Sequence, residues 1–269
     1  MIELLAGEIE IRRNRLLNLP FFDSELWLGR PLEYFAPTSG QITAGEVAGY
    51  VKARSLTGAL LSTTEGVLQS PQDGNRQLLE AEEYLPDSVF TVWTGLPLFP
   101  GEPGHLPVPG NLHKRCRGIR LFPKSHRFLL EDWTAGSLCA WMTDMYLPLF
   151  LWHVETDFTE LYRLVKQYPD LPVIIESQWQ KILYQLRTVY NLLRACPNIR
   201  LEMSNLVLPG AVEYCVREFG AERLLFGSFY PMAEPLTAQG LLIDADISRE
   251  QMVMIAGGNM EKLIREVRP

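Results

Sequence analysis

The sequence has few of the residues on which metal and redox sites depend. Its 269 residues include four histidines and four cysteines, and no two cysteines form a C-x-x-C pair. The short motifs G-x-G-x-x-G, G-x-x-x-x-G-K-S, G-x-S-x-G and H-E-x-x-H are also absent. Nucleotide-binding, serine-hydrolase and zinc-protease functions therefore have no support from motifs. Widely spaced cysteines favour a reducing compartment.

The chain also lacks a basic surplus and a long apolar run. Its 25 Lys and Arg residues face 32 Asp and Glu residues, which gives a formal net charge of −7 and no basic stripe to neutralise phosphates. The longest apolar run, around residues 147–152, is far too short to cross a bilayer. We therefore expect neither nucleic acid nor a membrane as a partner. A start without a basic-then-apolar signal predicts a cytoplasmic protein.

Short apolar runs that alternate with helical patterns indicate an α/β fold. Residues 224–226 are typical of a buried strand, and a helical stripe of apolar residues over 212–219 ends at Gly220 just before it. Thr43 and Glu46 have capping-box spacing at the start of another helical run. Further strand-like runs cover residues 58–62, 88–94, 117–123, 147–152, 171–177 and 196–204. This order predicts a single (β/α)8 TIM-barrel domain over 21–269.

Two segments lie outside this repeat. Residues 1–20 form an N-terminal appendage, in which residues 8–12 alternate like a short exposed strand. Residues 95–111 contain five prolines, four glycines and His105, a composition that excludes helix and strand interiors. Because this segment follows a strand, we expect it at the catalytic face of the barrel, as a lid or a pocket wall.

Several segments resemble the amidohydrolase-related family of metal-dependent TIM-barrel hydrolases and decarboxylases. RLLFGSFYP (223–231) is similar to the family's last barrel strand, R-hydrophobic-hydrophobic-F-G-S-D-x-P. LPFFDSELWLGRP (19–31) is similar to its first strand, D-x-H-x-H-x-G, CPNIRLEMS (196–204) to its seventh, and GGNMEKLI (257–264) to its closing helix. The resemblance spans roughly residues 21–265. It implies a barrel whose catalytic end holds a divalent metal on histidines and an aspartate.

Most of the positions that this resemblance assigns to the metal carry other residues. Glu25 and Trp27 replace the two histidines of the first strand, and Ser177 stands near the place of a strand-six histidine. Phe229 replaces the catalytic aspartate, and a phenyl ring can neither bind metal nor move a proton. His153, at the end of the fifth strand, is the family ligand that is kept.

The expected cofactor is therefore none, because a catalytic zinc site needs at least three well-placed ligands. Zinc or another divalent ion would require a rebuilt site, for which the ligands are His153, Glu25 and Glu176. The same residues suit a rebuilt hydrolase or decarboxylase. In that alternative His153 and Glu25, joined by Asp23 or Glu176, act as an acid–base pair.

The function that we predict is instead the binding of a small organic molecule at the barrel mouth. Such sites are largely apolar with a few polar anchors, and the resemblance places suitable residues there. The predicted binding residues are Trp27, Ser177, Phe229 and Tyr230, with Trp152 or Trp179 beside them and Glu25 and His153 as anchors. A third alternative is a scaffold without a ligand. Many aromatics that can lie at the surface permit a homo-oligomer in either case.

Overall fold

Eight parallel strands form the centre of the protein. The computed structural model describes residues 2–32, 40–97, 112–178 and 182–268. The strands pair in the order in which they occur in the chain. They are β1 (Phe22–Leu28), β2 (Gly58–Thr63), β3 (Val89–Thr94), β4 (Cys116–Leu121), β5 (Leu149–Trp152), β6 (Val173–Glu176), β7 (Ile199–Glu202) and β8 (Leu224–Leu225).

Hydrogen bonds between β1 and the segment after β8 close the sheet into a barrel. The backbone N–H of Ser24 donates to the carbonyl of Phe226 at 3.1 Å, and that of Trp27 donates to the carbonyl of Tyr230 at 2.9 Å. The register of β1 against β2 shifts between Asp23 and Leu26, a bulge of the kind that re-aims side chains. The predicted (β/α)8 TIM barrel is confirmed.

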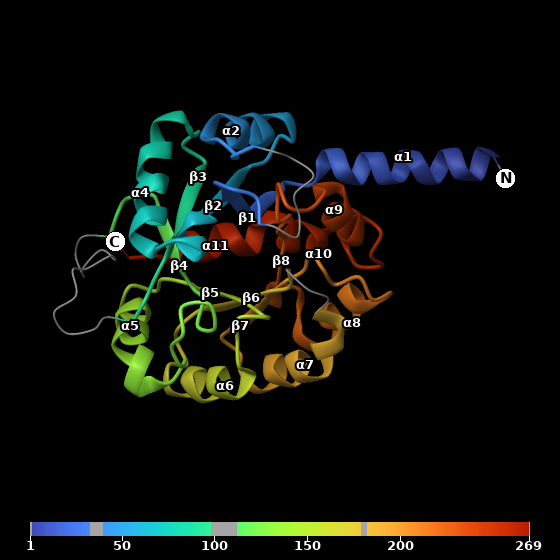
Figure 1. Cartoon of the computed structure of the whole chain (residues 1–269). Coiled ribbons are helices and arrows are strands. Elements are labelled where there is room, and N and C mark those ends of the chain that lie inside the picture. The colour runs from blue at the N-terminus through green and yellow to red at the C-terminus, as the bar shows by residue number, and fades with distance from the viewer. Residues whose placement is uncertain (1, 33–39, 98–111, 179–181, 269) are drawn as a thin grey trace.

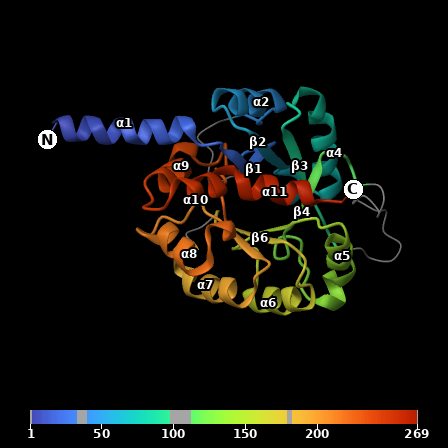
Figure 2. The same ribbon diagram turned by 180° about the vertical axis from the view of Figure 1, so that it is seen from behind.

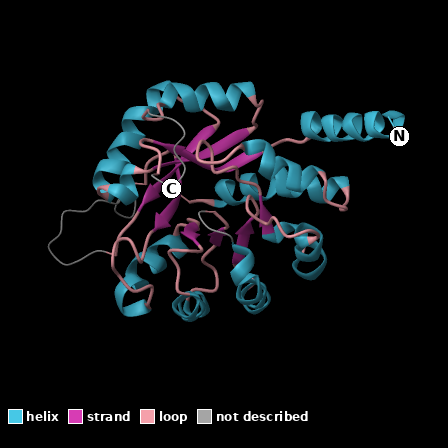
Figure 3. Ribbon diagram, turned by 45° about the vertical axis from the view of Figure 1, so that its right-hand side comes forward, coloured by secondary structure: helices cyan, strands magenta, loops and turns pink. Residues whose placement is uncertain are grey.

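The helices lie outside the sheet, most of them around the strands, one across an end of the barrel and one extending away from it (Figures 1 and 3). They are α1 (Ile2–Asn18), α2 (Ala44–Ala53), α3 (Glu65–Leu68), α4 (Pro71–Ala81), α5 (Asp132–Asp144), α6 (Phe158–Gln167), α7 (Leu186–Ala195), α8 (Ala211–Phe219), α9 (Pro235–Ile243), α10 (Arg249–Val253) and α11 (Asn259–Glu266). The predicted capping box is present at α2, where Glu46 N donates to Thr43 Oγ1 at 3.2 Å and Thr43 N donates to Glu46 Oε2 at 2.8 Å. Within the described segments, no helix is long and apolar enough to span a bilayer.

The strand that we predicted near the N-terminus is wrong. Residues 8–12 belong to α1, which extends away from the barrel (Figures 1 and 2). The alternation of Glu and Ile covers only a few residues, whereas the Glu, Leu and Arg that fill Ile2–Asn18 favour helix. The nearby strand β1 already pairs on both sides, with β2 and with the segment after β8.

The interior of the barrel is layered along the strand direction. The layer at the amino ends of the strands is apolar, and Met260, Leu263 and Ile264 of α11 pack onto it. That layer contains Phe22, Leu60, Val92, Phe150, Ile174 and Leu225. Because side chains on one face of a strand recur at every second residue, the next inward positions are Ser62, Arg120, Trp152 and Glu176. α11 thus covers one end of the barrel and leaves the other end for a site.

Candidate functional site

The middle of the barrel holds a buried ion pair between Arg120 of β4 and Glu176 of β6. Arg120 Nε donates to Glu176 Oε2 at 3.0 Å, and Nη2 donates to the other carboxylate oxygen. Arg120 Nη1 also donates to the Ser62 hydroxyl, and the guanidinium carbon lies 4.4 Å from the centre of the Trp27 ring. Arg120 is 1% exposed and Glu176 is 0% exposed. The guanidinium of Arg120 therefore supplies a positive charge in the interior of the barrel.

Glu25 of β1 lies in the same buried layer. Its Oε1 accepts a hydrogen bond from Trp152 Nε1 at 3.0 Å. Its Oε2 is buried and has no hydrogen-bond partner within the described residues, and the same is true of Trp27 Nε1. Burial raises the pKa of the Glu25 carboxyl well above its usual range, and the neighbouring charges of Glu176 and Glu202 raise this pKa further. These effects favour the protonated acid.

Glu202 of β7 is the third buried carboxyl group of this layer. It accepts hydrogen bonds from the Ser177 hydroxyl at 3.0 Å and N–H at 3.2 Å, and from the Ser204 hydroxyl at 2.8 Å. Burial nevertheless raises the pKa of Glu202 to about 8, and the bonds from Ser204 oppose this rise. Ser177 thus binds Glu202 in the structure, and its predicted role toward a substrate stays a prediction.

Asp23 connects β1 to the segment after β8. Its Oδ1 accepts from the backbone N–H of Ser228 at 2.9 Å and of Glu25 at 3.2 Å, and Tyr50 donates to its other oxygen at 3.3 Å. Burial raises the pKa of Asp23 to about 6, against the lowering effect of these hydrogen bonds. The chain segment that carries Phe229 is therefore fixed to β1 by a side chain as well as by the sheet.

A cluster of large apolar side chains covers this polar layer at the carboxyl ends of the strands. Its buried members are Trp27, Leu32, Phe122, Trp152, Phe229 and Met232. The rings of Trp27 and Trp152 lie 4.9 Å apart, and Phe229 meets each of them edge-on at 6.3 and 6.1 Å. Phe229 has a φ of 58°, a left-handed backbone conformation that is strained for a bulky residue and is often found at functional sites.

His153 and Tyr230, the remaining predicted site residues, are not members of this cluster. His153 is buried, its Nδ1 lies 2.8 Å from Gln185 Oε1, and its backbone N–H donates to the carbonyl of Glu176. Tyr230 stacks on Tyr50 of α2 at 3.9 Å and packs against the outer core. Their proposed roles in catalysis and binding stay predictions. Trp179, His105 and most of the predicted lid lie outside the described residues.

The carboxylates that the resemblance suggests as metal ligands are bonded to other side chains in the structure. Among the residues that the structure places, there is no group of three His, Cys, Asp or Glu side chains that could hold a metal ion; the ligand set of His153, Glu25 and Glu176 stays a prediction. Glu176 is bonded to Arg120 through both oxygens, and Glu25 Oε1 accepts from an indole. The donor set is thus directed toward a guanidinium and an indole rather than toward a metal.

Arg120 and Glu202 were missed by the sequence reasoning. Each is a charged residue at an inward position of an apolar strand, in CRGIRL and IRLE. Arg and Glu are almost never fully buried unless they are paired. The placement of a charged residue two positions from another inward residue was therefore a usable signal for a buried ion pair. A charged residue in a short strand can equally lie at a solvent-exposed strand edge. Only the partner across the barrel distinguishes the buried from the exposed position.

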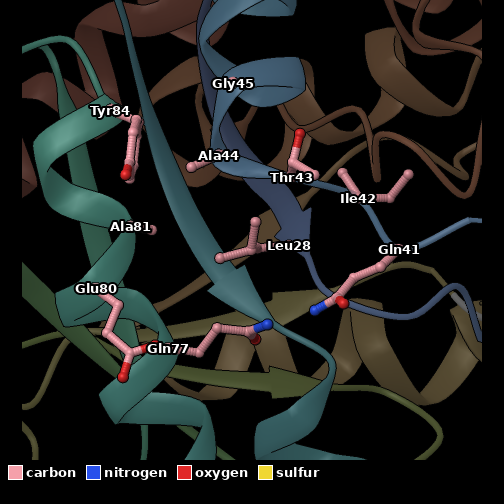
Figure 4. Close-up of a pocket in the computed structure, with 10 residues that line it drawn as sticks. All are labelled: Leu28, Gln41, Ile42, Thr43, Ala44, Gly45, Gln77, Glu80, Ala81 and Tyr84. Atoms are coloured by element: carbon pink, nitrogen blue, oxygen red, sulfur yellow. The ribbon is translucent and has the colours of Figure 1, made fainter.

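A separate pocket lies outside the barrel, between α2 and α4 (Figure 4). Its volume is about 410 Å3, and Leu28, Ile42, Ala81 and Tyr84 form its apolar wall. One of its polar side chains is already bonded, since Gln77 Oε1 accepts from the Thr63 hydroxyl. As far as the described residues reach, its lining includes none of the side chains of the buried layer, so we assign it no role in the site.

Comparison with known proteins supports the fold. No family model matches the sequence, and no curated protein matches it either. Amidohydrolase 2 from Bifidobacterium longum subsp. infantis is similar in structure, with a TM-score of 0.65 and 17% identity over 92% of this chain and 99% of that one. An amidohydrolase from Burkholderia multivorans with bound zinc gives a TM-score of 0.63 and 14% identity over 91% of this chain and 99% of that one.

A decarboxylase is equally similar. The 5-carboxyvanillate decarboxylase from Novosphingobium aromaticivorans, complexed with manganese and 4-hydroxy-3-methoxy-5-nitrobenzoic acid, gives a TM-score of 0.70 and 15% identity over 92% of this chain and 96% of that one. At such low identity these likenesses concern the fold alone. The chain therefore has the TIM-barrel fold of these amidohydrolases and decarboxylases, as its strand motifs predicted.

Proposed function

We propose that this barrel binds a small organic molecule at its mouth, beside Glu25 and Trp27, without a metal ion. One observation carries the proposal: Glu25 Oε2 and Trp27 Nε1 are buried and have no hydrogen-bond partner within the described segments. Buried polar groups in proteins are normally paired, so these two atoms are available to a ligand. An indole N–H donates, and a protonated carboxyl group can donate or accept.

The surroundings favour a neutral, planar ligand. Trp27, Trp152 and Phe229 present ring faces and edges, which suit an aromatic molecule. Arg120, the cation of this layer, is already paired with Glu176, so the layer is unfavourable for a further buried anion. Access to Glu25 requires the side chains of the covering cluster to move.

A thermal-shift screen tests the proposal. Ligands that bind the folded state raise its melting temperature, so we expect neutral aromatic amides and phenols to do so, and benzoate not to. Glu25→Gln and Trp27→Phe keep size and shape and should each weaken the shift. Trp133→Phe is a matched control, because Trp133 is 76% exposed on α5. Shifts of equal size in all three variants would contradict the assignment.

Acid–base catalysis by Glu25 is the competing function. A carboxyl group with a raised pKa in an apolar environment is typical of a general acid. Hydrolysis or decarboxylation that resists chelators and is lost in both Glu25→Gln and His153→Gln would replace the binding proposal with a rebuilt enzyme. The present contacts support this less well, since Glu25 is bonded to Trp152 and His153 to Gln185.

A further inference from the structure

The helix α1 carries apolar side chains that the described residues of its own chain leave exposed. It extends away from the barrel in both views (Figures 1 and 2). Ile9 is 63% and Leu17 is 69% exposed. With the exposed Arg13 they recur every four residues and so share one face of the helix. Because an isolated helix of this length is marginal in water, this face indicates a packing partner.

The attachment of α1 fixes the direction in which it extends. Arg12 Nε lies 2.7 Å from Asp244 Oδ1, and Arg15 Nη1 donates to the carbonyl of Ile243 at 2.5 Å. Both contacts hold the carboxyl-terminal half of α1 at the end of α9. At 1.5 Å per residue, the whole helix spans about 25 Å, so its amino-terminal half reaches outward from its own barrel.

An exposed apolar groove lies beside this attachment point. It has a volume of about 430 Å3 and runs between residues 206–213 and α9. Val207, Leu208 and Leu236 in its lining are 42%, 49% and 45% exposed. Its acidic residues are Glu213 and Asp244, with Asp246 next to them; Glu213 accepts a hydrogen bond from Asp246 N at 3.0 Å.

We propose that the chain forms a two-fold dimer in which α1 of each copy packs across the groove between 206–213 and α9 of its partner. Ile9 and Leu17 of α1 then cover the exposed valine and leucines. The charges are complementary as well, because the exposed Arg13 lies between Ile9 and Leu17 on this face of α1 and the groove carries Glu213, with Asp246 next to it. The helix and the groove both lie next to α9. One two-fold rotation therefore brings the helix of each copy onto the groove of the other, and a dimer with both contacts made is a closed assembly. This inference is independent of the proposed ligand.

Light scattering coupled to size-exclusion chromatography of the full chain tests the dimer. We expect Ile9→Glu and Leu208→Glu each to raise the dimer dissociation constant by about tenfold or more, because a two-fold axis places every substitution in both contacts. Trp133→Glu is the control, since Trp133 is exposed on α5, across the barrel from α9 (Figure 1). Circular dichroism melts check that each variant folds, and Arg13→Glu replaces Ile9→Glu if that variant does not.

Mixing the two variants distinguishes this arrangement from others. The helix of Leu208→Glu is intact, and so is the groove of Ile9→Glu, hence the mixed dimer keeps one native contact. We expect the mixture to associate more strongly than either variant alone. A monomeric wild-type protein overturns the proposal. So does a dimer that Ile9→Glu dissociates and Leu208→Glu leaves unchanged, because α1 would then pair with α1.

Discussion

Replacing Arg120 with methionine tests whether the stability of the protein depends on the positive charge inside the barrel. Methionine keeps an unbranched side chain but removes the charge and the hydrogen bonds. The change eliminates both bonds to Glu176, the bond to the Ser62 hydroxyl and the contact with the face of Trp27. Since Glu176 is 0% exposed, its carboxylate would stay desolvated beside the other buried glutamates.

The expected cost follows from the burial of the pair. Removing one partner of a buried ion pair destabilises a protein by about 3–5 kcal/mol. We expect the lower end of this range, because Glu176 can take up a proton: burial raises its pKa, and Arg120 is the group that opposes this rise. The exposed pair of Arg163 and Glu131, at 2.9 Å, is the matched control. Arg163→Met should cost about 1 kcal/mol or less.

The pH dependence gives the sharper result. Without Arg120, the folded-state pKa of Glu176 lies further above its unfolded value. A carboxyl group whose pKa is raised on folding does not destabilise the protein below the unfolded pKa. It destabilises the protein increasingly as pH rises toward the folded pKa. The free-energy difference between wild type and Arg120→Met should therefore be larger at about pH 8 than at about pH 5.

Urea unfolding of wild type, Arg120→Met, Glu176→Gln and the double variant measures both effects. We expect a coupling energy on the order of 2–3 kcal/mol between the two positions, and a double variant that is more stable than Arg120→Met alone. A loss below about 1 kcal/mol, the range of exposed pairs, would refute the reasoning. A loss that is the same at both pH values would refute it as well, since the charge of Glu176 would then play no part.

Three further predictions concern the same barrel. Because burial raises the pKa of Glu202 to about 8, stability should fall as pH rises from about 5 to about 8; Glu202→Gln should make this slope shallower in a series of thermal melts. Phe229→Asp places a charge among buried rings and should cost about 1–3 kcal/mol. Phe229→Asn, which tolerates the same left-handed backbone, isolates the charge; an unchanged melt of Phe229→Asp, or one that zinc raises, would contradict the pocket. Finally, protein purified without added metal should contain no stoichiometric zinc, manganese or iron, and elemental analysis near one ion per chain would contradict this.

Local sequence patterns determined the barrel. Buried strands need apolar runs, and helices need capping residues and a stripe of apolar side chains along one face. Each of these patterns can be recognised within a few residues of sequence. The capping box at Thr43 and the glycine at Gly220, with a φ of 93°, both lie where the sequence placed them. Helix ends are less well determined by such patterns: α7 begins at Leu186, after a short 3-10 turn over Ile182–Gln185. Helix ends depend on contacts that periodicity does not contain.

The sequence also singled out positions for a candidate site. Glu25, Trp27, Ser177 and Phe229 could be read against the strand motifs of a metal-dependent barrel without any structure. In the structure these residues are buried, as inward positions at strand ends should be. What each side chain binds could not be read in the same way.

Only the tertiary structure decided how the interior is paired. Arg120 meets Glu176 across 56 residues of sequence, and Trp152 meets Glu25 across 127. Such contacts depend on strand register and on the closure of the barrel, which the alternation within one strand does not specify. The wrong strand prediction for residues 8–12 has a local cause instead. The alternating run is short, and the helix propensity of the neighbouring residues outweighs it. Local patterns thus determine the elements, whereas closing the barrel determines which buried charges meet.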